Sequence, residues 1–286
     1  MAFKIVTDST SDLPVNWVKE NEITVLGLTI NLDGATYETV GDNRLTSSDL
    51  LEKMETGGLP TTSQVNVGQF EEVFEAAAKE GQEVLYLAFS SALSGTYQSG
   101  TIAREMVLDN YPNAVIEIVD TKAASIGEGY LVMQAVQARA AGKSLAETKA
   151  LIEDLVPRLR TYLLVDDLNH LVRGGRLSKA AALIGGLVNI KPLISINADG
   201  KLEPIGKVRG RKKGIKEMMS LTLANLDHST VMVAYTGDLE TAEAVKTSLL
   251  EDEQVTDVLV TELGPIIATH TGSGVLAIIS VNKEER

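Results

Sequence analysis

Apolar positions follow two different periods along the first 160 residues. Short apolar runs such as Val84 to Phe89 have the length and composition of buried strands. Longer segments such as Val67 to Lys79 repeat apolar residues every three to four positions, which predicts amphipathic helices. Alternating strands and helices predict a largely parallel sheet covered by helices on both faces. The expected strands are 3–7, 23–32, 84–89 and 114–119, and the expected helices are 15–20, 46–55, 67–79, 98–109, 126–141 and 144–158.

The pattern changes after about residue 160. Two apolar runs flank Ala198-Asp199-Gly200, which predicts an antiparallel hairpin over 193–208. Further strands are expected at 161–165, 230–235, 257–263 and 275–281, with helices at 168–172, after 213 and at 239–250, and with a turn at Gly264-Pro265. We therefore expect an N-terminal α/β domain over 1–160 and a C-terminal α+β domain over 161–286, with a mixed or antiparallel sheet in the second.

One polar turn, Ser90 to Tyr97, stands between the strand at 84–89 and the helix that follows. Backbone N–H groups and the positive end of a helix favour an anion at such a place, and the hydroxyls of Ser90, Ser91 and Ser94 can donate hydrogen bonds to it. Because the turn contains no Lys or Arg, the expected guest is a singly charged group such as a carboxylate. The alternative is that these serines only stabilise the turn and cap the helix.

Two other polar turns, Asp8-Ser9 and Asp120-Thr121, also follow expected strands. Ligands of parallel sheets bind at the carboxyl ends of the strands, so we expect all three turns on one edge of the sheet. Asp8, Asp12 and Asp120 could hold a hard cation there. The alternative is that they cap turns and helices.

Composition narrows the class of protein. The 286 residues are 44% apolar and 23% charged, as in ordinary soluble domains. A net charge of −13 argues against nucleic acid or an anionic membrane surface as a partner. The chain has no cysteine, no apolar run of about 20 residues, an N-terminus that turns polar too early for a signal peptide, and three histidines without metal-ligand spacing. We expect a cytoplasmic protein without metal, cofactor or membrane span.

Enzyme motifs are sparse. The chain has neither a nucleotide P-loop nor a nucleophile elbow. Gly272 to Ala277 matches a dinucleotide fingerprint in letters, but it precedes a strand instead of a helix. Ser94, His270 and an aspartate have the residue types of an acyl hydrolase or transferase, but for His270 taken alone a structural or hydrogen-bonding role is favoured over that of a catalytic base. The basic run Lys207 to Lys213 is either a solvated face or a docking site for an acidic partner.

Seven segments together resemble the DegV family, in the family's order and from end to end of the chain. The family implies a two-domain α/β protein that buries a long-chain fatty acid between its domains. Some members are the fatty-acid-binding subunit of bacterial fatty acid kinase, which presents the acyl carboxylate to a separate ATP-dependent kinase subunit for acyl phosphate formation. The segments are 8–14, 61–64, 90–97, 120–121, 171–176, 191–192 and 264–265 with 270–272.

The resemblance also implies roles for single residues. Thr62, Ser94 and His270 would surround the carboxylate, with Gly95 and Thr271 beside them. Arg173, Arg176 and Arg209 would lie near the mouth and meet the kinase. The apolar stretches 84–89, 126–136 and 181–190 are expected to form the slot for the acyl tail. The preferred interpretation is thus a binding protein rather than an enzyme; a stand-alone lipid-binding or regulatory protein is a further alternative.

Overall fold

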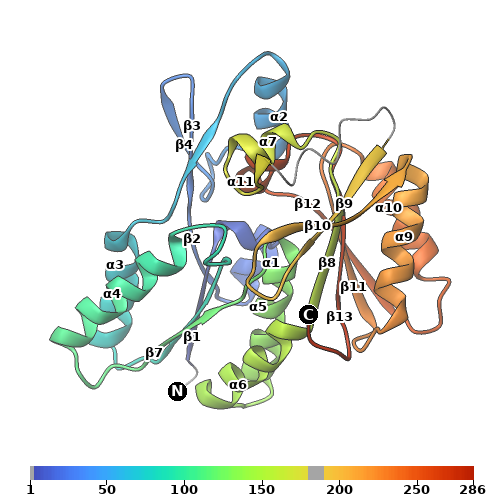
Figure 1. The fold of residues 1–286 in the computed structure, drawn as a ribbon. Helices are drawn as coiled ribbons and strands as arrows, with labels where there is room; N and C mark the ends of the chain where they lie inside the picture. The colour runs from blue at the N-terminus through green and yellow to red at the C-terminus, as the bar shows by residue number, and fades with distance from the viewer. Residues whose placement is uncertain (1–2, 180–189) are drawn as a thin grey trace.

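The computed structural model describes residues 3–179 and 190–286. Its first sheet is parallel, as predicted, with strand order β2-β1-β6-β7 (Figure 1). Helices cover both faces of this sheet, which confirms the predicted architecture of the N-terminal half. The strands are β1 (Lys4–Asp8), β2 (Thr24–Leu26), β6 (Val84–Ala88) and β7 (Ile116–Asp120).

The second sheet has six strands in the order β10-β9-β8-β13-β11-β12. Only β11 and β12 pair in parallel, so the sheet is mixed and largely antiparallel, as predicted. The predicted hairpin is present as β9 and β10. The strands are β8 (Leu159–Leu164), β9 (Ile190–Ile196), β10 (Leu202–Arg209), β11 (Thr230–Tyr235), β12 (Asp257–Glu262) and β13 (Leu276–Val281).

A third, small sheet corrects two predictions. The expected strand 23–32 is divided, because β2 joins the first sheet while β3 (Thr29–Leu32) pairs antiparallel with β4 (Ala35–Glu38). The polar composition of residues 60–64 by itself predicts a loop, yet β5 (Thr61–Ser63) pairs with the other edge of β3. A three-residue polar strand has no apolar period of its own, so its partner strand determines its conformation.

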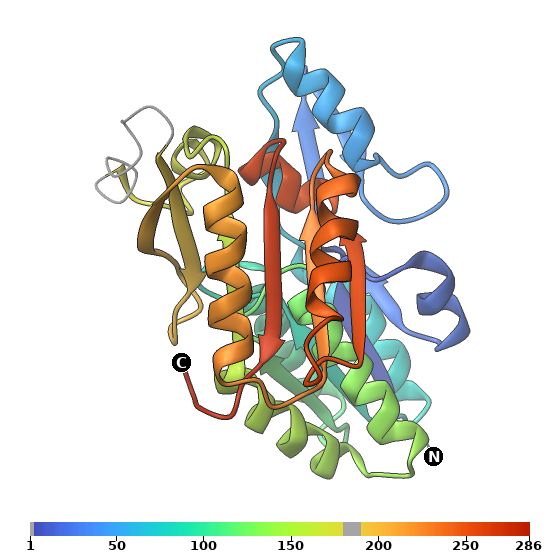
Figure 2. The ribbon, with the colours of Figure 1, turned by 90° about the vertical axis from the view of Figure 1, so that its right-hand side faces the viewer.

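Three layers of helices alternate with the two large sheets (Figures 1 and 2). Helices α3 and α4 cover one face of the parallel sheet, α5 and α6 lie between the two large sheets, and α9 and α10 cover the outer face of the six-stranded sheet. The helices are α1 (Val15–Glu20), α2 (Ser47–Glu55), α3 (Val67–Lys79), α4 (Thr96–Asn110), α5 (Ile126–Ala140), α6 (Leu145–Leu155), α7 (Asn169–Arg173), α9 (Arg211–Ala224), α10 (Leu239–Leu249) and α11 (Pro265–Thr271), with short 3-10 turns at Ser9–Ser11 and Val156–Arg158.

One hydrophobic core connects the two halves of the chain. Leu85 and Leu87 of β6, Leu131 of α5, and Met232 and Ala234 of β11 belong to the same buried cluster. The division into domains at residue 160 stays a prediction, but the ligand slot expected between the halves must lie within or beside this shared core. Among the described residues, no helix is long and apolar enough to cross a membrane.

Candidate functional site

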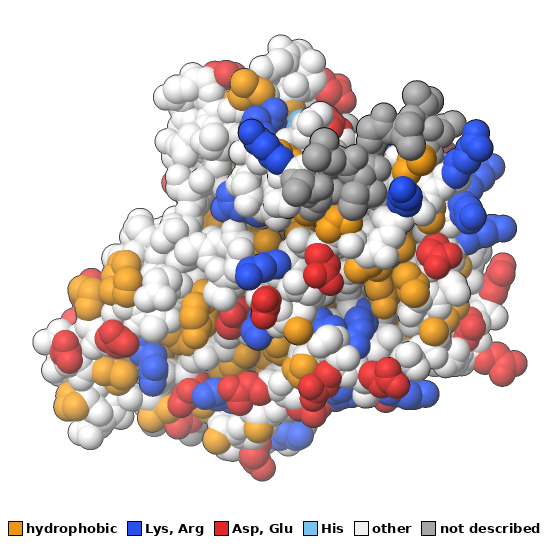
Figure 3. All heavy atoms as spheres, viewed as in Figure 1, with side chains coloured by type: hydrophobic (Ala, Val, Ile, Leu, Met, Phe, Trp, Pro, Cys, Tyr) orange, Lys and Arg blue, Asp and Glu red, His pale blue; other side chains and the backbone are white. Residues whose placement is uncertain are grey.

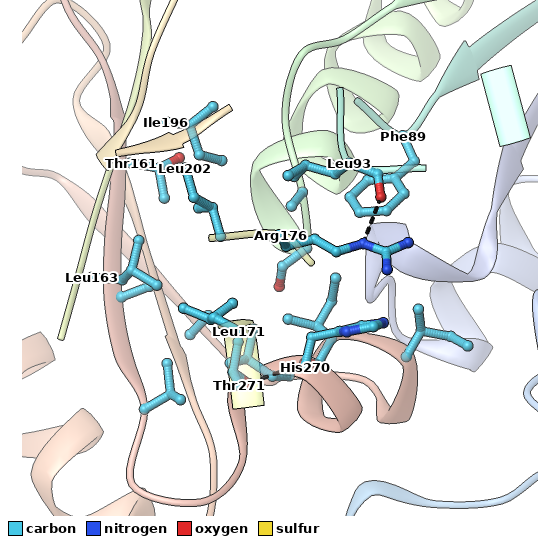
Figure 4. A pocket seen from close by; sticks show the side chains of 18 of the residues that line it. Phe89, Leu93, Thr161, Leu163, Leu171, Arg176, Ile196, Leu202, His270 and Thr271 are labelled. Carbon is cyan, nitrogen blue, oxygen red and sulfur yellow. Dashed lines mark hydrogen bonds between the residues drawn. The ribbon is translucent and has the colours of Figure 1, made fainter. Parts of the chain in front are cut away.

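A narrow, almost wholly apolar cavity lies where the two halves of the chain meet (Figure 4). The centre of a water molecule could occupy a volume of about 80 Å³ inside it. Its walls come from the loops at the carboxyl ends of the parallel strands, from the inner face of the six-stranded sheet and from α11. The lining residues are Leu28, Thr62, Phe89, Leu93, Ser94, Ala124, Ser125, Thr161, Leu163, Leu171, Arg176, Ile196, Leu202, Ala234, Leu263, Ile266, Ile267, His270, Thr271, Val275, Ala277 and Ile279.

The alternation of side chains along strands builds the sheet wall of the cavity. Ala277 and Ile279 of β13 line it, whereas Leu276 and Ile278, which alternate with them, pack on the opposite face with the core under α9 and α10. Successive side chains of a strand point to opposite faces, so a strand buried on both sides reads as one continuous apolar run. The sequence therefore shows the strand but does not show which residues face the cavity.

The polar side chains of the cavity stand on β5, α11 and the loops, except for Thr161 on the wall formed by the six-stranded sheet. Thr62 Oγ1 and His270 Nε2 share a hydrogen bond of 2.8 Å across 208 residues of chain. Ser94 and Thr271 also line the cavity, and Gly95 directly follows Ser94 at the N-terminus of α4. The structure thus brings together the five residues expected at the carboxylate.

His270 is held in its neutral form. Burial, together with the positive charges of Arg176 and Arg173, lowers the pKa of its imidazole from 6.5 to about 4, and burial is the largest of these causes. None of these causes is a neighbouring carboxylate. The hydrogen bond of the ring goes to Thr62, while Ser94 Oγ bonds to Thr96 at 2.9 Å. The described residues therefore do not assemble the Ser94–His270–aspartate constellation of a hydrolase.

The strand β5 and the start of α4 are fixed to each other next to Thr62 and Ser94. Gln64 Nε2 donates a hydrogen bond of 2.8 Å to Ser99 Oγ on α4. The amide of Gln64 lies so close to Gly95 that a Cβ at this position would overlap it. This contact gives a physical reason for a glycine after Ser94, and for the glutamine after the Thr-Thr-Ser strand.

Asp8 and Asp120 fix the polar turn at residues 90–97 by accepting hydrogen bonds at its start. Asp8 Oδ2 accepts a hydrogen bond of 3.1 Å from the backbone N–H of Phe89. Asp120 accepts hydrogen bonds from the backbone N–H and the hydroxyl of Ser91, at 3.1 and 2.6 Å. The three polar turns do share one edge of the sheet, as predicted. Ser91 stabilises the turn through its hydrogen bonds to Asp120, whereas Ser94 lines the cavity.

The three aspartates considered as ligands of a cation accept hydrogen bonds from other residues of the protein. Asp12 accepts a hydrogen bond of 2.5 Å from Ser125 Oγ, and burial raises the pKa of the Asp12 carboxyl to about 7. Asp8 accepts a hydrogen bond of 3.0 Å from the Tyr86 hydroxyl at Oδ2 and one of 2.6 Å from the Thr10 hydroxyl at Oδ1. No group of three metal-ligating side chains occurs in the described ranges, and the aspartates cap turns and bridge elements instead.

The three arginines expected at the kinase surface lie in different environments. Arg176 is half-buried and lines the cavity, and its Nε donates a hydrogen bond of 2.9 Å to the carbonyl of Leu93 (Figure 4). Arg173 is exposed and contacts His170 Nδ1 at 2.9 Å. Arg209 is exposed at the end of β10. Arg176 is therefore placed to act on a ligand, and the other two face solvent.

The predicted walls of the slot need correction. Of the stretches 84–89 and 126–136, only Phe89 lines the cavity, because β6 and α5 bury their side chains in the cores around the parallel sheet. The stretch 181–190 lies outside the described residues except for Ile190, which begins β9. The turn predicted at Gly264-Pro265 is in fact the start of α11, which begins at Pro265. Proline is favoured in the first turn of a helix, and this signal could have identified α11.

Comparisons with known proteins agree with this geometry. A model of the DegV family, described as uncharacterised protein, matches residues 2–283. A DegV domain-containing protein of Streptococcus pyogenes serotype M1 is 53% identical over 286 residues, which cover 100% of both chains. The structure of a DegV family protein from Thermus thermophilus, described as fatty acid binding, is 34% identical with a TM-score of 0.89 and covers 99% of this chain and 100% of its own. A fatty acid binding DegV family protein from Streptococcus agalactiae is 29% identical with a TM-score of 0.87, over 99% and 100% of the two chains. The chain belongs to the DegV family.

Proposed function

We propose that the protein binds a long-chain fatty acid in this cavity and presents the carboxylate to a separate ATP-dependent kinase subunit. The observation that carries the proposal is the lining of the cavity: its walls are almost wholly apolar, while the hydrogen-bonded Thr62–His270 pair, the Ser94 hydroxyl and the Arg176 guanidinium offer a polar site for the carboxylate. The fatty acid binding described for the relatives from Thermus thermophilus and Streptococcus agalactiae supports it.

The apolar walls supply most of the affinity in this proposal. Each methylene removed from water contributes about 0.8 kcal/mol, so a long chain gains on the order of 10 kcal/mol before association costs of about 4–15 kcal/mol. A hydrogen bond to a charged carboxylate adds about 1.5–3 kcal/mol. The tail therefore sets affinity, and the hydroxyls of Thr62 and Ser94 set where the carboxylate points.

The head-group end suits presentation rather than catalysis. Thr62 and Ser94 are half-buried, so a carboxylate beside them lies near the surface. In the proposed step, a carboxylate oxygen attacks the γ-phosphorus of ATP held by the kinase subunit; the new O–P bond forms as the β–γ bridge breaks, and ADP leaves. The role of this chain is to hold the oxygen in line, which contributes to the rate through orientation.

The test is a paired binding and kinase measurement. Lipid extracted from the purified protein should contain a long-chain fatty acid by mass spectrometry. After the ligand is stripped, Ser94→Ala and Thr62→Ala should each weaken palmitate binding by about 10- to 100-fold at most, while acyl phosphate formation with the kinase falls further. Ser248→Ala, on the exposed face of α10, is the matched control. If octanoate bound as tightly as palmitate, the apolar slot would not be an acyl site.

A further inference from the structure

One hydroxyl interrupts the apolar wall of the cavity. Thr161 lies on β8 and is only 6% exposed. Leu159 and Leu163, two residues away on either side, belong to the apolar core on the same face of the strand. Across the sheet, Thr161 pairs with Ile279 of β13. The position is thus surrounded by side chains that cannot accept a hydrogen bond.

The hydroxyl of Thr161 lacks a hydrogen-bond partner within residues 3–179 and 190–286. Thr161 Oγ1 is a buried oxygen without a hydrogen bond to any described residue. Burying an unpaired polar group destabilises a protein, and valine has nearly the same shape without this cost. The core packing of β8 therefore does not explain why threonine occupies this position.

The place of Thr161 in the cavity indicates what the hydroxyl could contact. Figure 4 shows Thr161 beside Ile196 and Leu202, across the cavity from His270. A ligand whose carboxylate lies at the Thr62–His270 pair would extend its tail towards Thr161. The hydroxyl would then meet the middle or distal part of the chain rather than the head group.

We propose that Thr161 selects acyl chains that carry a hydrogen-bonding oxygen, as a hydroxyl or oxo group, on the part of the tail that reaches β8. The inference rests on the proposed fatty acid binding and adds a substrate class to it. The Thr161 O–H donates to the oxygen of the ligand, which pairs two polar groups that would otherwise both be buried without partners. Plain and oxygenated chains of equal length are thereby distinguished.

The experiment uses stripped full-length protein with stearic acid and a set of monohydroxy-octadecanoic acids that differ only in the position of the hydroxyl. The wild-type protein should bind at least one hydroxy acid about tenfold more tightly, relative to stearic acid, than Thr161→Val does. Thr161→Ser, which keeps the hydroxyl, should retain the preference. Thr222→Val is the matched control, because Thr222 Oγ1 is also buried without a partner but lies on α9, outside the cavity.

The outcomes separate the two levels of the proposal. Equal ratios in the wild-type protein and Thr161→Val would overturn the selectivity assigned to Thr161 and leave fatty acid binding standing. Failure of the wild-type protein to bind stearic acid and every hydroxy acid would overturn the proposed function itself, and the selectivity with it.

Discussion

At the residue scale, the head-group end combines a neutral imidazole with a nearby permanent positive charge. Burial removes the proton from His270, and the guanidinium of Arg176 acts in the same direction. A bound carboxylate would reverse the second effect, because an opposite charge favours the protonated imidazole. The pKa of His270 is therefore a direct probe of where the ligand places its charge.

We predict that palmitate raises the pKa of His270 from its ligand-free value of about 4. Because the complex then binds more protons than the free protein, affinity should increase as the pH falls from 7 towards 5. Ring resonances of isotope-labelled histidine, titrated with and without palmitate and assigned with His270→Gln, measure the shift. An unchanged pKa would place the carboxylate away from this residue.

At the element scale, the Arg-Gly-Gly-Arg segment after α7 connects the surface to the cavity. Gly174 packs directly against His270, and a Cβ at this position would overlap the Nδ1 atom of the ring. Gly175 has φ +74°, a conformation that other residues rarely adopt. The two glycines bring α7 against α11 and turn the chain so that Arg176 enters the cavity wall.

We predict that Gly174→Ala weakens palmitate binding by about tenfold or more, because the added methyl displaces the imidazole from Thr62. Gly174 has φ −72°, which alanine adopts without strain, so the loss should come from the displaced ring. Gly206→Ala on β10 is the control, since a Cβ there meets no atom within 4 Å. Calorimetric titration of both variants measures the difference. Normal palmitate binding by Gly174→Ala would show that the position of the imidazole is not critical.

At the scale of the whole molecule, positive charge is concentrated on one edge of an acidic protein. Figure 3 shows Lys and Arg side chains gathered over the region of β10 and the start of α9. Arg211 is paired with Asp166 at 3.4 Å. Arg173 and Arg209 form no ion pair with a described acidic residue. Because the whole chain carries a net charge of −13, its other faces would repel an acidic partner.

We predict that Arg173→Ala and Arg209→Ala reduce acyl phosphate formation with the kinase subunit while palmitate binding stays unchanged. Raised salt should weaken the wild-type reaction in the same way, because exposed charges are screened. Arg44→Ala is the control, since this exposed arginine lies in the loop before α2 and bonds only to the carbonyl of Gly41. If both docking variants lost palmitate, these arginines would serve the ligand site rather than the partner.

Elements with local signals can be predicted from the sequence. The structure confirms the helices expected over 67–79 and from residue 144, and the second begins with a capping box of Ser144 and Glu147. The polar turns after β1, β6 and β7 could be placed on one edge because parallel strands align their carboxyl ends. Residues 90–97 are predicted as a candidate anion site because a hydroxyl-rich turn there leads into the N-terminus of a helix.

The position of the cavity and the residues around it follow from tertiary contacts alone. β5 exists because β3 offers it an edge, and Thr62 meets His270 because that pairing and α11 bring together residues 208 positions apart. A strand buried on both faces gives no sign of which side chains line a cavity, so the wall containing Thr161 and Ile279 could not be predicted from its apolar run. Local propensity acts over a few residues, whereas a binding site between two sheets depends on contacts that form only when the whole chain has folded.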